Sequence, residues 1–261
     1  MIIDFLSFPI QSDSEDSIKK MNFNILNNYI DENIQNNNKI SFSLLCIEND
    51  DVFFDKNFKF LASDSVNKFG FVALINPSNP KTNQIIEIIN KFDSIKGIAF
   101  HPYMHDITNS DIAKIEYIIS NIKSNAFVGV FTAYGSKNIY QINPLIIAKE
   151  IVKMSKFRNI IFYHAGGSKI LDAFLIAEMW PNVYLETSFS LSYWKNSSIE
   201  NDFNFVIKSL GSHRVIFGSD HPFIDINKAL KDHDVFFEKY KIDKKMQEDI
   251  YFNNAKKILN L

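Results

Sequence analysis

The sequence has 261 residues, of which 46% are hydrophobic and 22% charged, with a formal net charge of -2. This composition is typical of a globular domain, and the near-neutral charge gives no reason to expect nucleic acid or an anionic membrane surface as a partner. Cys46 is the only cysteine, which excludes an internal disulfide and a cysteine-rich zinc site.

No apolar run reaches the roughly 20 residues of a membrane span, so a membrane is not an expected partner either. Asp4 interrupts the apolar residues at the N-terminus, and no basic region precedes them. This pattern argues against a signal peptide, and the cytoplasm is therefore the expected location.

Short apolar runs alternate with helical segments along the chain. The predicted strands are Ile2–Leu6, Ile40–Ile47, Gly70–Ile75, Gly97–Phe100, Phe127–Phe131, Ile160–Tyr163, Val183–Glu186 and Val215–Gly218. The predicted helices are Asp13–Asn38, Asn57–Phe69, Asn79–Phe92, Asn109–Ile122, Pro144–Ser155, a segment capped by Ser168 and ending at Met179, Asn201–Leu210, Ile224–Tyr240 and Lys244–Leu259. An open doubly wound sheet would also alternate in this way, but eight units in this length favour a single (β/α)8 TIM barrel, forming one domain over residues 1–261.

In such a barrel the active site lies at the C-terminal ends of the strands, and several strands here end in polar residues. Asp220 follows the eighth strand, Glu186 ends the seventh, and His164 and His101 follow the sixth and fourth. An acid at the end of a buried strand is costly to desolvate, so Asp220 needs either a structural partner, such as a helix N-terminus or a cation, or a role in chemistry. His164 is either a hydrogen-bonded structural histidine or an active-site residue.

Six segments of the chain resemble the amidohydrolase-related family of metal-dependent TIM-barrel hydrolases, the relatives of aminocarboxymuconate-semialdehyde decarboxylase. They are Phe71–Pro77, Lys96–Pro102, Ile161–Gly167, Asn182–Ser188, Arg214–Phe223, and Asn254-Ala255 with Ile258-Leu259. The resemblance covers roughly residues 57–261. It implies that Asp220 is a metal ligand and proton acceptor and that His164 is the active-site histidine of the sixth strand.

The first and fifth strands depart from the family pattern. The resemblance places two metal-binding histidines where this sequence has Leu6 and Phe8, and a third after a fifth strand that here runs into Phe131-Thr132-Ala133. A catalytic zinc needs about three protein ligands, and only His164 and Asp220 remain. The metal site is therefore predicted to be degenerate and no cofactor is expected; a divalent metal such as zinc would have these two ligands alone.

Five further residues are predicted to bind substrate: His101, Glu186, Tyr163, Phe8 and Trp194. Each has a simpler interpretation. His101 could hold its loop, Glu186 could form an ion pair across the barrel mouth, and the aromatic side chains could simply pack. His213 and His233 are expected at the surface.

Two functions from different classes fit these observations. The first is a hydrolase acting on a small cyclic or carboxylated compound, with Asp220 and His164 as the acid–base pair; decarboxylation is a lesser alternative. The second is a barrel that has lost catalysis and binds a small ligand or a protein partner. The enzyme is favoured because Asp220 and His164 remain where other ligand positions are lost. The resemblance also allows a homodimer.

Overall fold

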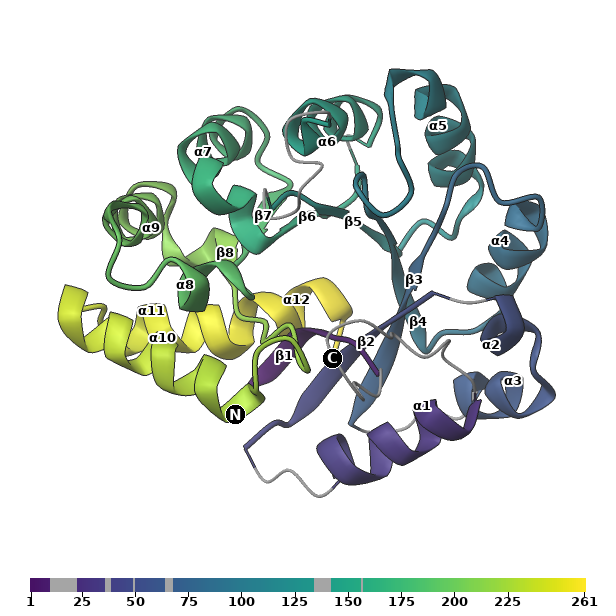
Figure 1. Ribbon diagram of the computed structural model, residues 1–261, viewed down its shortest axis with the longest axis horizontal. Coiled ribbons are helices and arrows are strands. Elements are labelled where there is room, and N and C mark those ends of the chain that lie inside the picture. The colour runs from purple at the N-terminus through teal and green to yellow at the C-terminus, as the bar shows by residue number, and fades with distance from the viewer. Residues whose placement is uncertain (10–22, 36–38, 49, 64–67, 134–141, 156) are drawn as a thin grey trace.

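The computed structural model describes residues 1–9, 23–35, 39–48, 50–63, 68–133, 142–155 and 157–261 (Figure 1). Eight parallel strands follow one another in chain order around a ring, with the helices on its outside (Figure 1). The strands are β1 Ile3–Ser7, β2 Phe42–Ile47, β3 Phe69–Leu74, β4 Ile95–Phe100, β5 Phe127–Phe131, β6 Ile160–Tyr163, β7 Val183–Glu186 and β8 Val215–Ile216. The predicted (β/α)8 barrel is confirmed, while the extent of the single domain stays a prediction.

The helices vary in length and type. The α-helices are α1 Phe23–Tyr29, α2 Asp50–Phe54, α3 Lys56–Ser63, α4 Thr82–Lys91, α5 Ile112–Asn121, α6 Pro144–Met154, α7 Ile170–Met179, α8 Ser190–Tyr193, α9 Ser198–Leu210, α10 Ile226–Tyr240, α11 Lys244–Glu248 and α12 Asn254–Leu259. Three 3-10 segments are η2 Asn109–Asp111, η3 His164–Lys169 and η4 Ser212–Arg214. Two π-helical segments are η1 Ile30–Gln35 and η5 Asp249–Asn253.

The predicted elements differ from the structure mainly at their ends. The predicted helix Asn57–Phe69 extends too far, because Phe69 pairs with Ser43 at the start of β3. The predicted helix Asp13–Asn38 lies partly outside the described residues, and residues 23–35 of it are helical. The expected Ser168 cap is not formed before α7, whereas Thr108 accepts from the Ser110 N–H before α5. Short polar caps compete over one or two positions, so sequence alone does not choose between them.

Two apolar layers hold the barrel together. The outer layer lies between the strands and the helices, and the inner layer fills the barrel interior with side chains such as Phe5, Phe127 and Tyr163. Helix α12 adds Ile258 and Leu259 to the inner layer beside β1, so the two ends of the described chain lie close together (Figure 1). None of the helices in the described ranges is long and apolar enough to cross a membrane.

The barrel closes differently between β8 and β1 than between the other strands. Seven neighbouring pairs form parallel ladders, those of β1–β2 and β3–β4 with a register shift, whereas the β8–β1 seam has one isolated bridge, between Ser7 and His221. Three backbone hydrogen bonds cross it, from Phe5 N to Phe217 O, from Asp220 N to Leu6 O and from Phe8 N to His221 O. The segment that carries Asp220, which follows β8, is therefore held to β1 by these few backbone contacts together with side-chain hydrogen bonds to Ser219.

His233 is not at the surface, so that expectation was wrong. The ring is 1% exposed on α10, with Nδ1 at 2.8 Å from Ala229 O and Nε2 at 2.8 Å from Thr187 Oγ1. His233 lies on an amphipathic helix between charged neighbours, so the sequence pattern did not predict that its ring is buried. Burial lowers the pKa of His233 from its ordinary 6.5 to about 4.

The buried His233 predicts a loss of stability in mild acid. The folded protein favours the neutral His233 ring, so the contribution of this ring to the free energy of unfolding is fully present above pH 6.5. As the pH falls from 6.5 towards 4, that contribution is lost, because the unfolded chain binds a proton that the folded chain excludes. At pH 5 this corresponds to a loss of about 2 kcal/mol. Urea unfolding at pH 7.5 and 5.0 should show a smaller pH effect in His233→Gln than in the wild type. The exposed control His213→Gln should keep the wild-type pH effect, and an equal effect in all three proteins would contradict the prediction.

Candidate functional site

The barrel brings the predicted catalytic residues to one end. His101 directly follows β4, and His164 directly follows β6. Glu186 is the last residue of β7, and Asp220 lies a few residues after the end of β8. Since all eight strands are parallel, these residues lie at the C-terminal mouth of the barrel. The electrostatic neighbours agree: His164 lowers the pKa of His101, and Glu186 raises the pKa of Asp220.

Asp220 is buried without a hydrogen-bond partner for its carboxyl group among the described residues. The residue is 5% exposed, and only its backbone is bonded, the N–H to Leu6 O at 2.9 Å and the carbonyl to Ile224 N at 3.3 Å. Its φ of +64° is rare for an L-residue and turns the chain sharply at the end of β8. The N-cap of the next helix is Asp225. Neither structural interpretation of Asp220, cap or ion pair, applies to it.

Burial, followed by the nearby carboxyls of Glu186 and Asp4, raises the pKa of Asp220 well above 3.8. No cation is among the causes of this shift. Three acids therefore share a region of low polarity, and the Asp220 carboxyl holds its proton more readily than an exposed aspartate does.

His164 lies in a turn that orients its ring. His164 and Ala165 both have positive φ values, of +65° and +49°, and two glycines follow with φ values of +82° and +57°. The ring is 8% exposed, and its Nδ1 lies 3.1 Å from Ser188 O and 3.0 Å from Ser188 Oγ. Its Nε2 has no hydrogen bond from a described residue. Burial lowers the pKa of His164 to about 4, so the ring is neutral at pH 7.

Glu186 is fully buried and accepts hydrogen bonds without forming an ion pair in the described part of the chain. Its carboxylate accepts from Ser188 N at 2.8 Å, Ser188 Oγ at 2.6 Å and His164 N at 3.2 Å. Gly218 makes room for it, because a Cβ at that position would lie 2.0 Å from Glu186 Oε1. Burial raises the pKa of Glu186 to about 8.

Phe131, at the end of β5, is the centre of an aromatic cluster at the mouth. It stacks on His101 at 4.5 Å between ring centroids and on Tyr163 at 4.8 Å, and it packs against Phe8 at 6.0 Å and His164 at 5.4 Å. Phe131 itself is buried, with His101 and Tyr163 stacked on it, so the aromatic wall that stays accessible beside the polar residues is formed by the partly buried Phe8 and His101. Such a wall suits a planar ring.

The remaining predicted residues differ in their accessibility. His101 is partly buried, and its Nδ1 accepts from Met104 N at 3.3 Å, so its neutral ring carries the hydrogen on Nε2. Burial and the nearby His164 and His105 lower the pKa of His101 to about 3. Phe8 is partly buried, whereas Tyr163 is completely buried below Phe131.

Trp194 follows α8, and its ring contact in the described chain is with Tyr193 at 5.0 Å. Tyr193 stacks on Phe189, which in turn contacts the His164 ring. Trp194 therefore lies at the outer end of a chain of aromatic rings that begins at His164. Its role in binding substrate stays a prediction, as do the roles of the other site residues.

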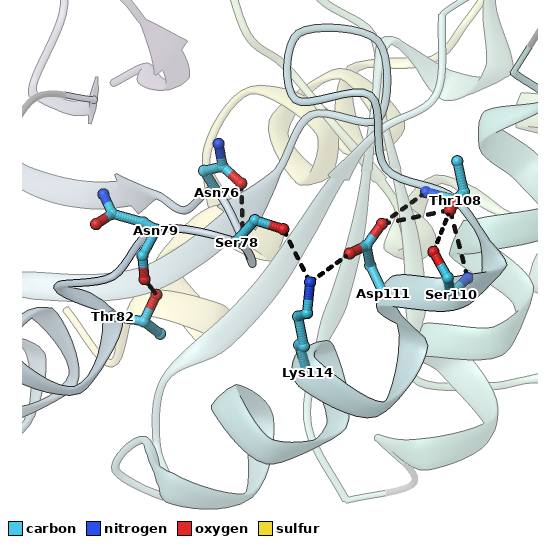
Figure 2. Close-up of polar contacts among 8 residues, drawn as sticks. All are labelled: Asn76, Ser78, Asn79, Thr82, Thr108, Ser110, Asp111 and Lys114. Atoms are coloured by element: carbon cyan, nitrogen blue, oxygen red, sulfur yellow. Dashed lines mark hydrogen bonds and ion pairs between the residues drawn. The ribbon is translucent and has the colours of Figure 1, made fainter.

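A separate groove of about 480 Å³ lies outside the mouth, between the loop after β3 and helix α5 (Figure 2). Lys114 Nζ donates to Ser78 Oγ and to Asp111 Oδ1, both at 3.0 Å, and Asn76 Oδ1 accepts from Ser78 N at 2.9 Å (Figure 2). Asp111 also accepts from Thr108 N at 3.1 Å. Lys114, the charged residue of the groove lining, is paired with Asp111, so the mouth is the better candidate for a reaction site.

The comparisons with known proteins agree with this architecture. A sequence model of the family described as Amidohydrolase matches residues 136–261. Residues 136–261 are amidohydrolase-like in sequence. This stretch contains His164, Glu186 and Asp220, and the resemblance predicted from the sequence is confirmed. Among curated proteins, none matches the chain.

Several solved structures share the fold over the whole chain. An amidohydrolase from Burkholderia multivorans with bound HEPES has a TM-score of 0.65 and 12% identity. A probable 2-pyrone-4,6-dicarboxylic acid hydrolase from Acinetobacter baumannii has a TM-score of 0.63 and 14% identity, and 5-carboxyvanillate decarboxylase from Sphingomonas paucimobilis has 0.62 and 13%. Each match covers 100% of this chain and 99% of the other. At these identities the likeness shows the fold alone.

The residues of this amidohydrolase-like barrel do not fit a three-ligand metal site. Leu6 is completely buried in the inner layer, and Phe8 packs against Phe131 where the family resemblance places ligands. Within the described ranges, no three His, Cys, Asp or Glu side chains are grouped so that they could hold a metal. Of the acids at the mouth, Glu186 and Asp4 already accept hydrogen bonds from their neighbours. Independence from metal stays a prediction.

Asp4 and Ser188 are important residues that sequence reasoning did not single out. Asp4 is fully buried and joins β1 to the residues after β8: it accepts from Ser219 N at 2.7 Å, Ser219 Oγ at 2.6 Å and Ser7 Oγ at 2.7 Å. Burial raises its pKa. A signal existed for both residues. Asp4 is an acid inside an apolar strand, and Ser188 follows Glu186 by two residues in the family-like segment Asn182–Ser188.

The Asp4 contacts predict a large cost for removing its carboxyl group. Asp4→Ala removes the acceptor of the buried Ser219 N–H and of the Ser7 hydroxyl, at about 1–3 kcal/mol each, and leaves the Ser219 hydroxyl with the Leu6 carbonyl at 3.3 Å, so we expect a loss of at least about 2 kcal/mol in urea unfolding. Asp4→Asn keeps one acceptor and should lose less. The control is Asp93→Ala, whose side chain is fully exposed and whose removal should change stability by less than about 0.5 kcal/mol. Equal losses in Asp4→Ala and Asp93→Ala would refute the role of Asp4.

Proposed function

We propose that the protein is an amidohydrolase-like enzyme that hydrolyses, or less readily decarboxylates, a small cyclic or carboxylated compound. One observation carries the proposal. His164 Nε2 and the Asp220 carboxyl are reactive groups at the barrel mouth that no described residue engages, although neighbouring acids are bonded. Leaving a buried carboxyl unpaired costs stability, and a bound substrate offsets that cost.

The two residues are suited to opposite steps of proton transfer. Neutral His164 can take a proton from an attacking water, since its ring does not hold one at pH 7. Asp220, whose raised pKa favours the protonated form, can donate a hydrogen bond or a proton to the substrate oxygen that gains charge. This reverses the role of proton acceptor that the family resemblance implies for Asp220.

The surroundings favour an uncharged or weakly charged ring as substrate. Phe8 and His101 are the accessible rings of the aromatic cluster, and His101 is neutral, so its Nε2–H can donate to a substrate oxygen. Two of the structural neighbours are named for cyclic carboxylated compounds, 2-pyrone-4,6-dicarboxylic acid and 5-carboxyvanillate. These names support the class of substrate proposed for this chain.

Turnover after metal removal tests the proposal. Purified protein treated with a chelator and checked by elemental analysis should still convert one or more members of a panel of aromatic lactones, esters and hydroxybenzoates. His164→Ala and Asp220→Asn should each lower kcat/KM by about 10²-fold or more, the usual contribution of a positioned acid or base. His213→Ala, an exposed histidine, should keep wild-type activity.

Three outcomes contradict the proposal in different ways. A stoichiometric metal whose removal abolishes turnover indicates that other groups rebuild the metal site. Unchanged turnover in both variants removes His164 and Asp220 from the reaction. A compound that raises the melting temperature but is not consumed indicates a barrel that only binds its ligand.

A further inference from the structure

The hydrogen on the His164 ring can be assigned from its contacts. Nδ1 lies 3.1 Å from the Ser188 carbonyl oxygen, which has no hydrogen to give, so Nδ1 must be the donor. The Ser188 hydroxyl, at 3.0 Å from Nδ1, gives its own hydrogen to Glu186 Oε2 and is free to accept. A neutral imidazole has one N–H, so Nε2 carries a lone pair.

Glu186 holds both partners of this contact. One oxygen accepts from Ser188 N at 2.8 Å, and the other accepts from Ser188 Oγ at 2.6 Å and from the His164 backbone N–H at 3.2 Å. The two Glu186 oxygens thus fix the backbone that carries His164 and the residue that accepts from its ring. Gly218, two residues after β8, leaves the space that this arrangement needs.

The turn after Ser188 aims its carbonyl at the ring. Phe189 has φ +54°, which is rare for an L-residue, and the Ser188 carbonyl also accepts from Ser190 N across this turn. A carbonyl oxygen has two lone pairs, so it can accept from both Ser190 N and His164 Nδ1. The Phe189 ring packs 5.9 Å from the His164 ring.

We propose that Glu186 and Ser188 are positioning residues that fix the hydrogen of His164 on Nδ1 and so present the Nε2 lone pair to the substrate. The inference rests on the proposed function, in which His164 is the base. Neither residue touches the reacting atoms. Their effect passes through the orientation and tautomer of the imidazole, as partners of an active-site histidine commonly act.

Ser190 provides a matched control in the same loop. Ser188 and Ser190 are both buried, but Ser190 Oγ has no hydrogen-bond partner among the described residues. Ser188→Ala and Ser190→Ala therefore remove the same group two residues apart. Only the first removes a contact with His164.

The first test is ¹⁵N NMR of protein labelled on histidine, at pH 7, which distinguishes a protonated from an unprotonated ring nitrogen. The His164 signals are assigned by their loss in His164→Gln or, if that variant does not fold, by elimination with variants of the other five histidines. We expect one neutral form with the hydrogen on Nδ1. A ring protonated on Nε2 in the wild type overturns the inference, whatever the activity.

The second test compares variants. Ser188→Ala removes the hydroxyl acceptor of Nδ1 but keeps the carbonyl, so it should weaken the preference for the hydrogen on Nδ1 and lower kcat about tenfold with little change in KM, a small part of the 10²–10⁴ that a general base contributes. Ser188→Thr should restore both, and Ser190→Ala should change neither. Equal effects of Ser188→Ala and Ser190→Ala would falsify the positioning role. If His164→Ala keeps full turnover while the wild-type NMR shows hydrogen on Nδ1, the proposed function fails and the tautomer assignment stands.

Discussion

The candidate site depends on how the barrel closes between its first and last strands. Strand β8 has two residues, and its seam with β1 has an isolated bridge in place of a regular ladder. Asp4 replaces part of that ladder, since its side chain accepts from both the backbone and the hydroxyl of Ser219. Ser219 lies between Gly218, which makes room for Glu186, and Asp220. The residues after β8 therefore both close the barrel and position the candidate site.

Three buried carboxyls, on Asp4, Glu186 and Asp220, lie within electrostatic reach of one another without a cation among the causes of their pKa shifts. Burial raises the pKa of each of them. Hydroxyl and backbone N–H groups offset that cost for Asp4 and Glu186, whereas the Asp220 carboxyl has no such donors in the described chain. All three acids are deeply buried, so burial does not distinguish them. Hydrogen bonding does: Asp4 and Glu186 have structural donors, and the Asp220 carboxyl is left for a ligand.

The sequence predicted the barrel well because eight buried parallel strands leave short apolar runs, and β5, β6 and β7 have the predicted bounds. It also placed Asp220, His164, His101 and Glu186 at strand ends, which a parallel barrel brings together. It could not predict their partners. The contacts of Asp4 with Ser219 and of His233 with Thr187 join residues far apart in the sequence, and nothing local distinguishes His233 from an exposed helical histidine.

The same contacts constrain what can occupy the mouth, whether the barrel catalyses a reaction or only binds. The His101 Nε2–H is a donor, His164 Nε2 is an acceptor, and Asp220 in its protonated form is a donor. A well-matched occupant therefore has two oxygen acceptors and one group, water included, that gives a hydrogen to His164. A flat ring can pack against the partly buried aromatic rings of Phe8 and His101. A lactone or aromatic ester with an attacking water meets all of these conditions, whereas a highly charged compound meets no compensating cation among the electrostatic neighbours of Asp220.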